Sequence, residues 1–193
     1  NFNTSKVINM KNLFKGCKLL TSIIIEDNFI TSKVEYMINM FADCNSLIAL
    51  DTTYFDTSKV TNMASMFSEC KKLNSINLEN FITDKVVDMN SMFKDCLSLT
   101  SINLRNFDTS IVTNMDFMFS NCWQLYEINI DNFDLRLLNS MAYIFNNCKS
   151  ATSIKLPNIE TLKVINISHM FSECSSLKSI DLSNFDTSSV IYM

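Results

Sequence analysis

Apolar and polar positions recur along this chain with a period of 26 residues. A representative unit, residues 55–80, reads FDTSKVTNMASMFSECKKLNSINLEN, and the same pattern aligns along the whole chain. All 12 methionines fall in two columns of this alignment, and every phenylalanine except Phe117 falls in two further columns. A fixed period of this length marks a repeat architecture. We therefore expect residues 1–193 to form a single repeat solenoid, in which each coil rebuilds the same core.

Each unit predicts one short helix and one short strand. The apolar side chains of residues 60–70 fall on a stripe about 120° wide on a helical wheel, as an amphipathic helix requires. Asp, Thr and Ser at 56–58 stand where a helix cap is expected. Residues 73–78 read LNSINL and end in an alternating pattern, which favours a strand. The expected fold is an α/β solenoid with one helix and one strand per coil, right-handed by the usual preference of crossover connections.

Turns are needed in every coil, yet the chain has one glycine, Gly16, and one proline, Pro157. Asparagine precedes the recurrent phenylalanine in most units, as at Asn80 and Asn106. Asparagine tolerates the left-handed region of backbone space. We therefore expect this column to take the place of glycine, and its side chains to be able to bridge successive coils.

The repeat resembles a known family. The spacing LxxIxL is typical of leucine-rich repeats, and residues 99–122, LTSINLRNFDTSIVTNMDFMFSNC, resemble the 26-residue repeat of BspA-like bacterial surface proteins of the DUF285 type. The resemblance covers essentially the whole chain. It implies a leucine-rich-repeat-type solenoid of about seven coils, one per cysteine, displayed at a cell surface or secreted. It also implies adhesion, or non-covalent binding of a protein or glycan on a host or neighbouring cell.

The chain opens and closes inside a repeat, so we expect a fragment of a longer array with both ends uncapped. Apolar coil faces at such ends could associate end to end. An array of this kind could instead be a stalk or spacer that presents another domain. No apolar run reaches the roughly 18 residues of a membrane span, so we expect contact with a membrane only through an anchor outside this sequence.

Charge and cysteine spacing exclude several functions. The formal net charge of −4 argues against nucleic-acid binding. The seven cysteines recur once per unit and predict a ladder of buried free thiols, with disulfides between rungs the less favoured alternative. With one histidine, one glycine and no CxxC pair, the sequence predicts no metal site, no cofactor and no catalytic centre.

The candidate binding residues are those that the repeat does not require. Phe117, Tyr143 and His169 share one column, opposite the apolar stripe, so we expect three rings on the solvent-facing side of the helix. Trp123 and Tyr126 add two more unusual rings near the start of a strand. Our hypothesis is a recognition stripe, because aromatic residues are favoured interface anchors. The alternative is scattered surface apolar groups, which are normal.

The outward positions of the strands predict a polar face of mixed charge. One row on this face contains Asp51, Asn77, Asn103, Asn129, Lys155 and Asp181. Such a face suits weak, extended contacts, or it is simply solvated.

Overall fold

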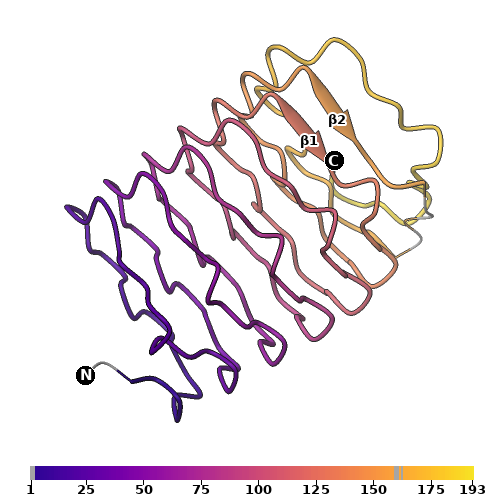
Figure 1. The fold of residues 1–193 in the computed structure, drawn as a ribbon. Coiled ribbons are helices and arrows are strands. Elements are labelled where there is room, and N and C mark those ends of the chain that lie inside the picture. The colour runs from indigo at the N-terminus through magenta and orange to yellow at the C-terminus, as the bar shows by residue number, and fades with distance from the viewer. Residues whose placement is uncertain (1–2, 159–160, 162) are drawn as a thin grey trace.

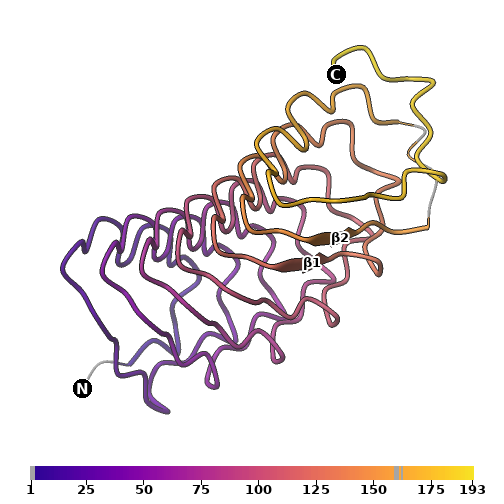
Figure 2. The ribbon, with the colours of Figure 1, turned by 90° about the horizontal axis from the view of Figure 1, so that it is seen from above.

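The computed structural model of this chain describes residues 3–158, 161 and 163–193. Successive coils stack side by side in chain order along one axis, and the two termini lie at opposite ends of the stack (Figures 1 and 2). The expected solenoid is confirmed. Its interior is a continuous core to which each coil contributes the same columns.

Stacked phenylalanines run through this core. The ring centroids of Phe41 and Phe67 lie 5.7 Å apart, and those of Phe67 and Phe93 also lie 5.7 Å apart, with interplanar angles of 0° and 8°. The methionines of both columns are buried beside them, as at Met63 and Met66, except Met193, which is 82% exposed. Burial of each such side chain contributes about 1.5–3 kcal/mol. The phenylalanine and methionine columns of the sequence alignment therefore form the core, as predicted.

The predicted helix of each coil is replaced by consecutive turns, and no helix occurs anywhere in the described residues. The Met66 N–H donates to the Met63 carbonyl at 3.1 Å, and Ser65 between them has a φ of 55°. A positive φ at the third of four residues is the mark of a type II turn. The same arrangement recurs four residues later, where Glu69 has a φ of 60°.

The helix fails because its N–H groups are used between coils. In residues 63–69 every second N–H donates to a carbonyl of the following coil, over donor–acceptor distances of 2.7–3.0 Å. These bonds run from Met63 to Asp88, from Ser65 to Asn90, from Phe67 to Met92 and from Glu69 to Lys94. An α-helix would use the same groups within one coil, from residue i to residue i−4.

The predicted strand forms regularly in only two coils of the described chain. β1 (Glu127–Asn129) pairs in parallel with β2 (Ser153–Lys155), so that Asn129 lies opposite Lys155. In the coils before β1 this contact is reduced to single bonds, such as that from the Thr100 N–H to the Asn74 carbonyl at 3.3 Å. The expectation of one strand per coil is therefore wrong outside this pair.

Five of the seven free thiols are buried, as the predicted cysteine ladder requires, and Cys174 is half-buried. The Cys96 thiol donates to the Phe67 carbonyl of the preceding coil at 3.2 Å, and Cys70, Cys122 and Cys148 repeat this bond. Burial raises the pKa of each of these thiols, and it raises the pKa of Cys44 to about 11. Cys17 differs from them, because it lies exposed. Each buried thiol thus acts as a small apolar group that also bridges two coils.

The first prediction concerns thiol reactivity. In the native protein at pH 8, a water-soluble disulfide reagent should label Cys17 within minutes, because reaction requires an accessible thiolate. The buried thiols should react only at the rate of unfolding, and all seven should react in denaturant. Mass spectrometry of the labelled peptides measures the difference. Fast labelling of Cys96 or Cys122 in the native state would contradict the burial of the cysteine ladder.

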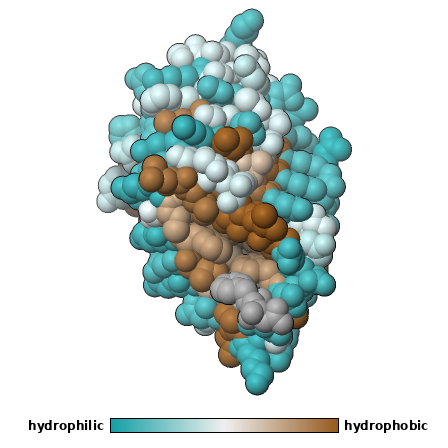
Figure 3. Space-filling view, turned by 60° about the vertical axis from the view of Figure 1, so that its left-hand side comes forward, coloured by the Kyte–Doolittle hydropathy of each residue, from teal (hydrophilic) through white to brown (hydrophobic). Residues whose placement is uncertain are grey.

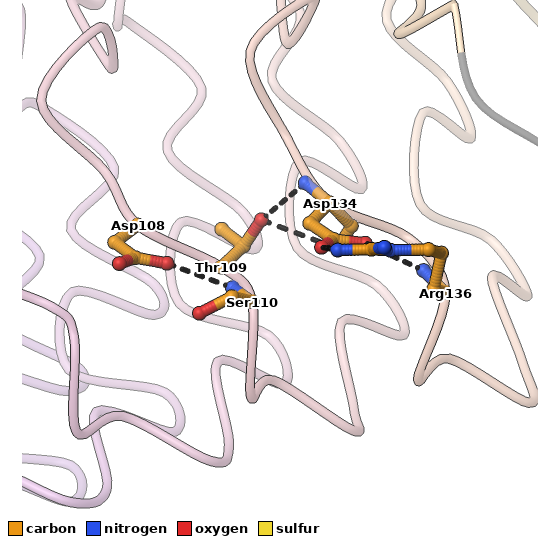
Figure 4. Close-up of polar contacts among 5 residues, drawn as sticks. All are labelled: Asp108, Thr109, Ser110, Asp134 and Arg136. Carbon is orange, nitrogen blue, oxygen red and sulfur yellow. Dashed lines mark hydrogen bonds and ion pairs between the residues drawn. The ribbon is translucent and has the colours of Figure 1, made fainter.

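Buried threonines form a second bridge between coils. The Thr109 hydroxyl accepts the Asp134 N–H at 2.7 Å and donates to the Asp134 carbonyl at 3.2 Å (Figure 4). The same pair of bonds joins Thr83 to Asp108. Leu135 takes the place of this threonine in the next coil and is buried, but it has no hydroxyl. A repeated side chain therefore satisfies backbone groups that the turns leave unpaired.

Replacing Thr109 with valine should test this bridge. Thr109→Val keeps the shape of the side chain but leaves a backbone donor and acceptor without their partner, which costs about 1–3 kcal/mol. The free energy of unfolding in urea should fall accordingly. Thr113→Val is the matched control, because the exposed Thr113 hydroxyl makes one long bond, 3.3 Å, to the Val87 carbonyl. An equal loss in both variants would contradict the bridge.

Carboxylates close a recurrent turn on the surface. The Asp108 carboxylate accepts the Ser110 N–H at 2.9 Å (Figure 4), and Asp56 and Asp186 do the same with Ser58 and Ser188. These hydrogen bonds from the serines lower the pKa of all three carboxyl groups. The charged form of each carboxyl is therefore favoured in the folded chain.

The protein should consequently lose stability in acid. A depressed folded-state pKa contributes stability that is fully present above the unfolded value of about 3.9. That stability is lost as the pH falls through the lower folded-state values. The melting temperature should be steady from pH 7 to 5 and should drop between pH 4 and 2. The drop should be smaller in a triple variant with Asn at 56, 108 and 186, and an unchanged drop would exclude these groups as its cause.

Candidate recognition surface

Phe117, Tyr143 and His169 come together as a stack on the turn side of the solenoid. The ring centroids of Phe117 and Tyr143 lie 4.7 Å apart at an interplanar angle of 11°, and those of Tyr143 and His169 lie 4.5 Å apart at 17°. Phe117 and Tyr143 are half-buried and His169 is exposed. We call these three residues the aromatic ladder. They occupy turns rather than the outer side of a helix, but their outward placement is as expected.

The backbone of the aromatic ladder is left-handed. Phe117, Tyr143 and His169 have φ values of 61°, 58° and 56°. A bulky residue with a positive φ is an outlier, and each such residue costs about 1–3 kcal/mol. In the other described coils the same column holds residues that suit this conformation better, and all of them have positive φ: Asn12, Asn39, Ser65 and Ser91. The fold alone therefore favours asparagine or serine where the rings stand.

The aromatic ladder presents the edges of its rings. Each ring covers a face of its neighbour, and the Lys94 ammonium lies 5.5 Å from the centroid of the Phe117 ring. Aromatic edges carry partial positive charge. The ladder therefore suits side chains and carbonyl groups that pack against ring edges, and it offers little open ring face for a flat ligand.

Trp123 and Tyr126 do not extend the aromatic ladder. Trp123 is 40% exposed, and the Lys149 ammonium lies 4.7 Å from its ring centroid. Tyr126 is 57% exposed. Among the residues that the structure describes, no ring contact joins either of them to the ladder. The five candidate residues thus comprise the three-residue aromatic ladder and two residues that lie apart from it.

Two adjacent hollows lie along the strand side of the solenoid. The larger, of about 480 Å³, is lined by Arg105, Tyr126, Glu127 and Lys155 among others. The second, of about 420 Å³, also has Lys155 in its lining, together with Asp131 and Asp181. Tyr126 is therefore placed in a groove, which sequence reasoning did not predict.

The described part of the chain shows no metal-binding cluster, and its buried thiols are poor nucleophiles. No three His, Cys, Asp or Glu side chains there lie close enough to hold a metal ion. The buried thiols have raised pKa values, which removes the thiolate that a cysteine nucleophile needs. The same part contains no helix of the length and apolarity that a membrane crossing requires.

Apolar side chains are also exposed at the first described coil. Figure 3 shows a hydrophobic band across the face of the molecule that is seen when the N-terminal coils are turned forward. The large apolar residues exposed in this region include Ile8, Leu13, Leu19 and Ile24. End-to-end association through such a face stays a prediction.

Comparison with known proteins agrees with the repeat. The family model described as "Mycoplasma protein of unknown function, DUF285" matches residues 1–75, 47–158 and 139–193. The fold is similar to that of a leucine-rich repeat protein from T. pallidum, with 19% identity, a TM-score of 0.53, and coverage of 82% of this chain and 78% of that chain. This likeness shows a leucine-rich-repeat fold.

Two further solved structures are more distant. A leucine-rich repeat protein from Bacteroides ovatus is 21% identical, with a TM-score of 0.30 and coverage of 96% of this chain and 76% of that one. A leucine-rich cell surface protein from Faecalibacterium prausnitzii is 17% identical, with a TM-score of 0.31 and coverage of 90% and 77%. No curated protein matches the chain.

Proposed function

The chain belongs to the DUF285 family, and on that premise we propose that it is a cell-surface module that binds a protein partner without catalysis. The observation that supports this proposal is the aromatic ladder. Phe117, Tyr143 and His169 stack on the surface at left-handed positions. The left-handed backbone recurs at this position in the other described coils, so the unusual feature is the row of aromatic side chains.

The energetics of the ladder favour a role outside the fold. Each stacked aromatic pair contributes about 0.5–1.5 kcal/mol beyond its buried area. Phe117 and Tyr143 are bulky residues at positive φ and cost about 1–3 kcal/mol each, which is no less than the two pairs return. The core also does not need the rings, because the coils before Phe117 carry asparagine or serine in this column. A binding partner would account for their presence, since aromatic side chains are frequent anchors of protein interfaces.

A cell-surface location is compatible with the thiols. Oxidising compartments favour paired cysteines, whereas all seven cysteines here are free. Five of them, Cys44, Cys70, Cys96, Cys122 and Cys148, are buried, so oxidants reach them only when the chain opens. Adhesion to a host or neighbouring cell is the biological role that we propose for this location.

Replacing two rings of the ladder should weaken binding without unfolding the chain. Phe117→Ser with Tyr143→Ser introduces the residue that Ser65 and Ser91 provide in the same left-handed column. The affinity for a surface protein partner, measured by biolayer interferometry, should fall about thirtyfold, the loss expected of an interface anchor. The melting temperature should stay the same, because serine holds the same left-handed backbone at Ser65 and Ser91.

The control replaces two exposed apolar residues elsewhere on the surface. Ile111→Lys with Leu137→Lys removes side chains that are 38% and 40% exposed, and lysine occupies the same column at Lys59 and Lys85. This variant should keep its affinity for the partner. Full affinity in the serine variant would remove the ladder from the interface and would favour a stalk or spacer role.

A further inference from the structure

Lys155 breaks a hydrogen-bonding rule that the other coils from Asp51 to Asp181 follow. At the end of the strand segment, an Asp or Asn side chain accepts the backbone N–H of the residue two positions later. The bonds join Asp51 to Thr53, Asn77 to Glu79, Asn103 to Arg105, Asn129 to Asp131 and Asp181 to Ser183, at 2.9–3.2 Å. The turn thus favours Asp or Asn in this row, because their side-chain oxygens accept its free backbone N–H.

The coil that carries Lys155 has lost that donor. The residue two positions after Lys155 is Pro157, and proline has no backbone N–H. An acceptor at position 155 would have nothing to bind there, so the turn no longer selects the side chain. Lysine can therefore occupy this position without the loss of a turn hydrogen bond of the kind that Asn103 and Asn129 accept.

The freed lysine stands at the centre of the groove on the strand side. Lys155 is the residue that the two hollows share, and β2 holds it opposite Asn129 of β1. Its ammonium group makes no hydrogen bond or ion pair within the part of the chain that the structure describes. The position rests on the one stretch of described chain with regular strand pairing, which makes it a fixed point on the surface.

The larger hollow is rich in free hydrogen-bond donors. The side-chain oxygens of Asn103 and Asn129 are occupied by the turn bonds, so their amide nitrogens are the groups left for a ligand. Arg105 adds a guanidinium without a side-chain partner in the described residues. Against these donors and the Lys155 ammonium, the lining of the larger hollow contains one carboxylate, that of Glu127. Such a lining complements a ligand with carboxylate and hydroxyl oxygens.

Tyr126 offers this hollow an open ring face. The rings of Phe117, Tyr143 and His169 are stacked on one another, and the Trp123 ring lies under a lysine. Tyr126 has no such cover among the described residues and is 57% exposed. A sugar ring has a face of C–H groups that can lie on an aromatic face, and hydroxyl groups around its rim that need polar partners.

We propose that the groove around Lys155 binds a carboxylate-bearing sugar of a glycan chain. The Lys155 ammonium and the Arg105 guanidinium pair with the carboxylate, since charge-assisted hydrogen bonds are the stronger ones. The Asn103 and Asn129 amides donate to ring hydroxyls, Glu127 accepts from them, and Tyr126 packs against the sugar face. This site goes beyond the proposed function, because it lies on the strand side and does not use the aromatic ladder.

Calorimetric titration of the whole chain tests this site with defined probes. The acidic probes are trigalacturonic acid and 3′-sialyllactose, and the neutral counterparts are the methyl ester of the first and lactose. The acidic sugars should bind at least about tenfold more tightly than the neutral ones, because the neutral forms leave the two cations unpaired. Binding should weaken as salt is added, since salt screens exposed charges.

Two variants and a control assign the residues. Lys155→Asn introduces the residue that Asn103 and Asn129 provide in the preceding coils of the same row, and it should weaken acidic-sugar binding about tenfold, the loss expected for one charge-assisted bond. Tyr126→Thr, which copies Thr100 and Thr152, should weaken both acidic and neutral sugars. Lys163→Ser copies Ser189 and removes the same charge outside the groove, so affinity should change by no more than about twofold.

Several outcomes would overturn the proposal. They are no binding of either acidic sugar, equal binding of the neutral ones, or an equal loss in the Lys163→Ser control. Tighter binding of triglutamate than of both acidic sugars would identify an acidic peptide site instead. The Phe117→Ser, Tyr143→Ser variant should bind the acidic sugars normally, so failure at this groove and failure at the ladder are separate results.

Discussion

The constraint on which this solenoid depends is that backbone N–H groups of each coil must donate to carbonyl groups of the next coil. Between residues 63 and 69 every second N–H reaches a carbonyl of the following coil, while the remaining N–H groups close turns within the coil. This alternation requires two left-handed residues per coil, such as Ser65 and Glu69. Because buried backbone groups must be paired, the arrangement fixes the spacing between coils. The stacked phenylalanines, the thiol bonds and the threonine bridges all repeat at that spacing.

The same constraint gives meaning to the surface. A left-handed position on the outside of the coil favours small or polar residues, and Asn12, Asn39 and Ser65 meet that preference. Phe117 and Tyr143 do not, so their side chains are present in spite of the backbone. In an ordinary surface loop an exposed ring needs no explanation. At a backbone position that disfavours it, a ring in two successive coils indicates selection for something other than folding.

The sequence predicts which side chains point inward or outward better than it predicts the backbone conformation. Met63, Met66, Phe67 and Cys70 share one side of a helical wheel, and they also share the inner side of consecutive turns, so the wheel cannot separate the two. The left-handed positions leave only a compositional trace, since the Glu69 column holds one glycine, Gly16, and four Asp or Asn residues, which tolerate a positive φ. The asparagines before the recurrent phenylalanine are not among the residues with positive φ, although Asn106 and Asn132 do bridge coils through their amides. Core columns, free thiols and outward rings were therefore predictable, whereas turns and the sparse strands were not.

The two candidate sites depart from the repeat in physically different ways. At Phe117 the backbone requirement remains, and the departure is opposed by strain that the ring stack only partly offsets. At Lys155 the requirement itself is absent, because Pro157 removes the donor that an acceptor would serve. The first kind of departure indicates selection directly. The second only removes the need for an acceptor at position 155. Its functional interpretation depends on the surrounding groups, namely the open face of Tyr126 and the unused amide donors of Asn103 and Asn129. In the sequence alignment both substitutions look alike, as departures from the repeat. The structure distinguishes them: the backbone disfavours a ring at Phe117, whereas at Lys155 the backbone no longer requires an acceptor.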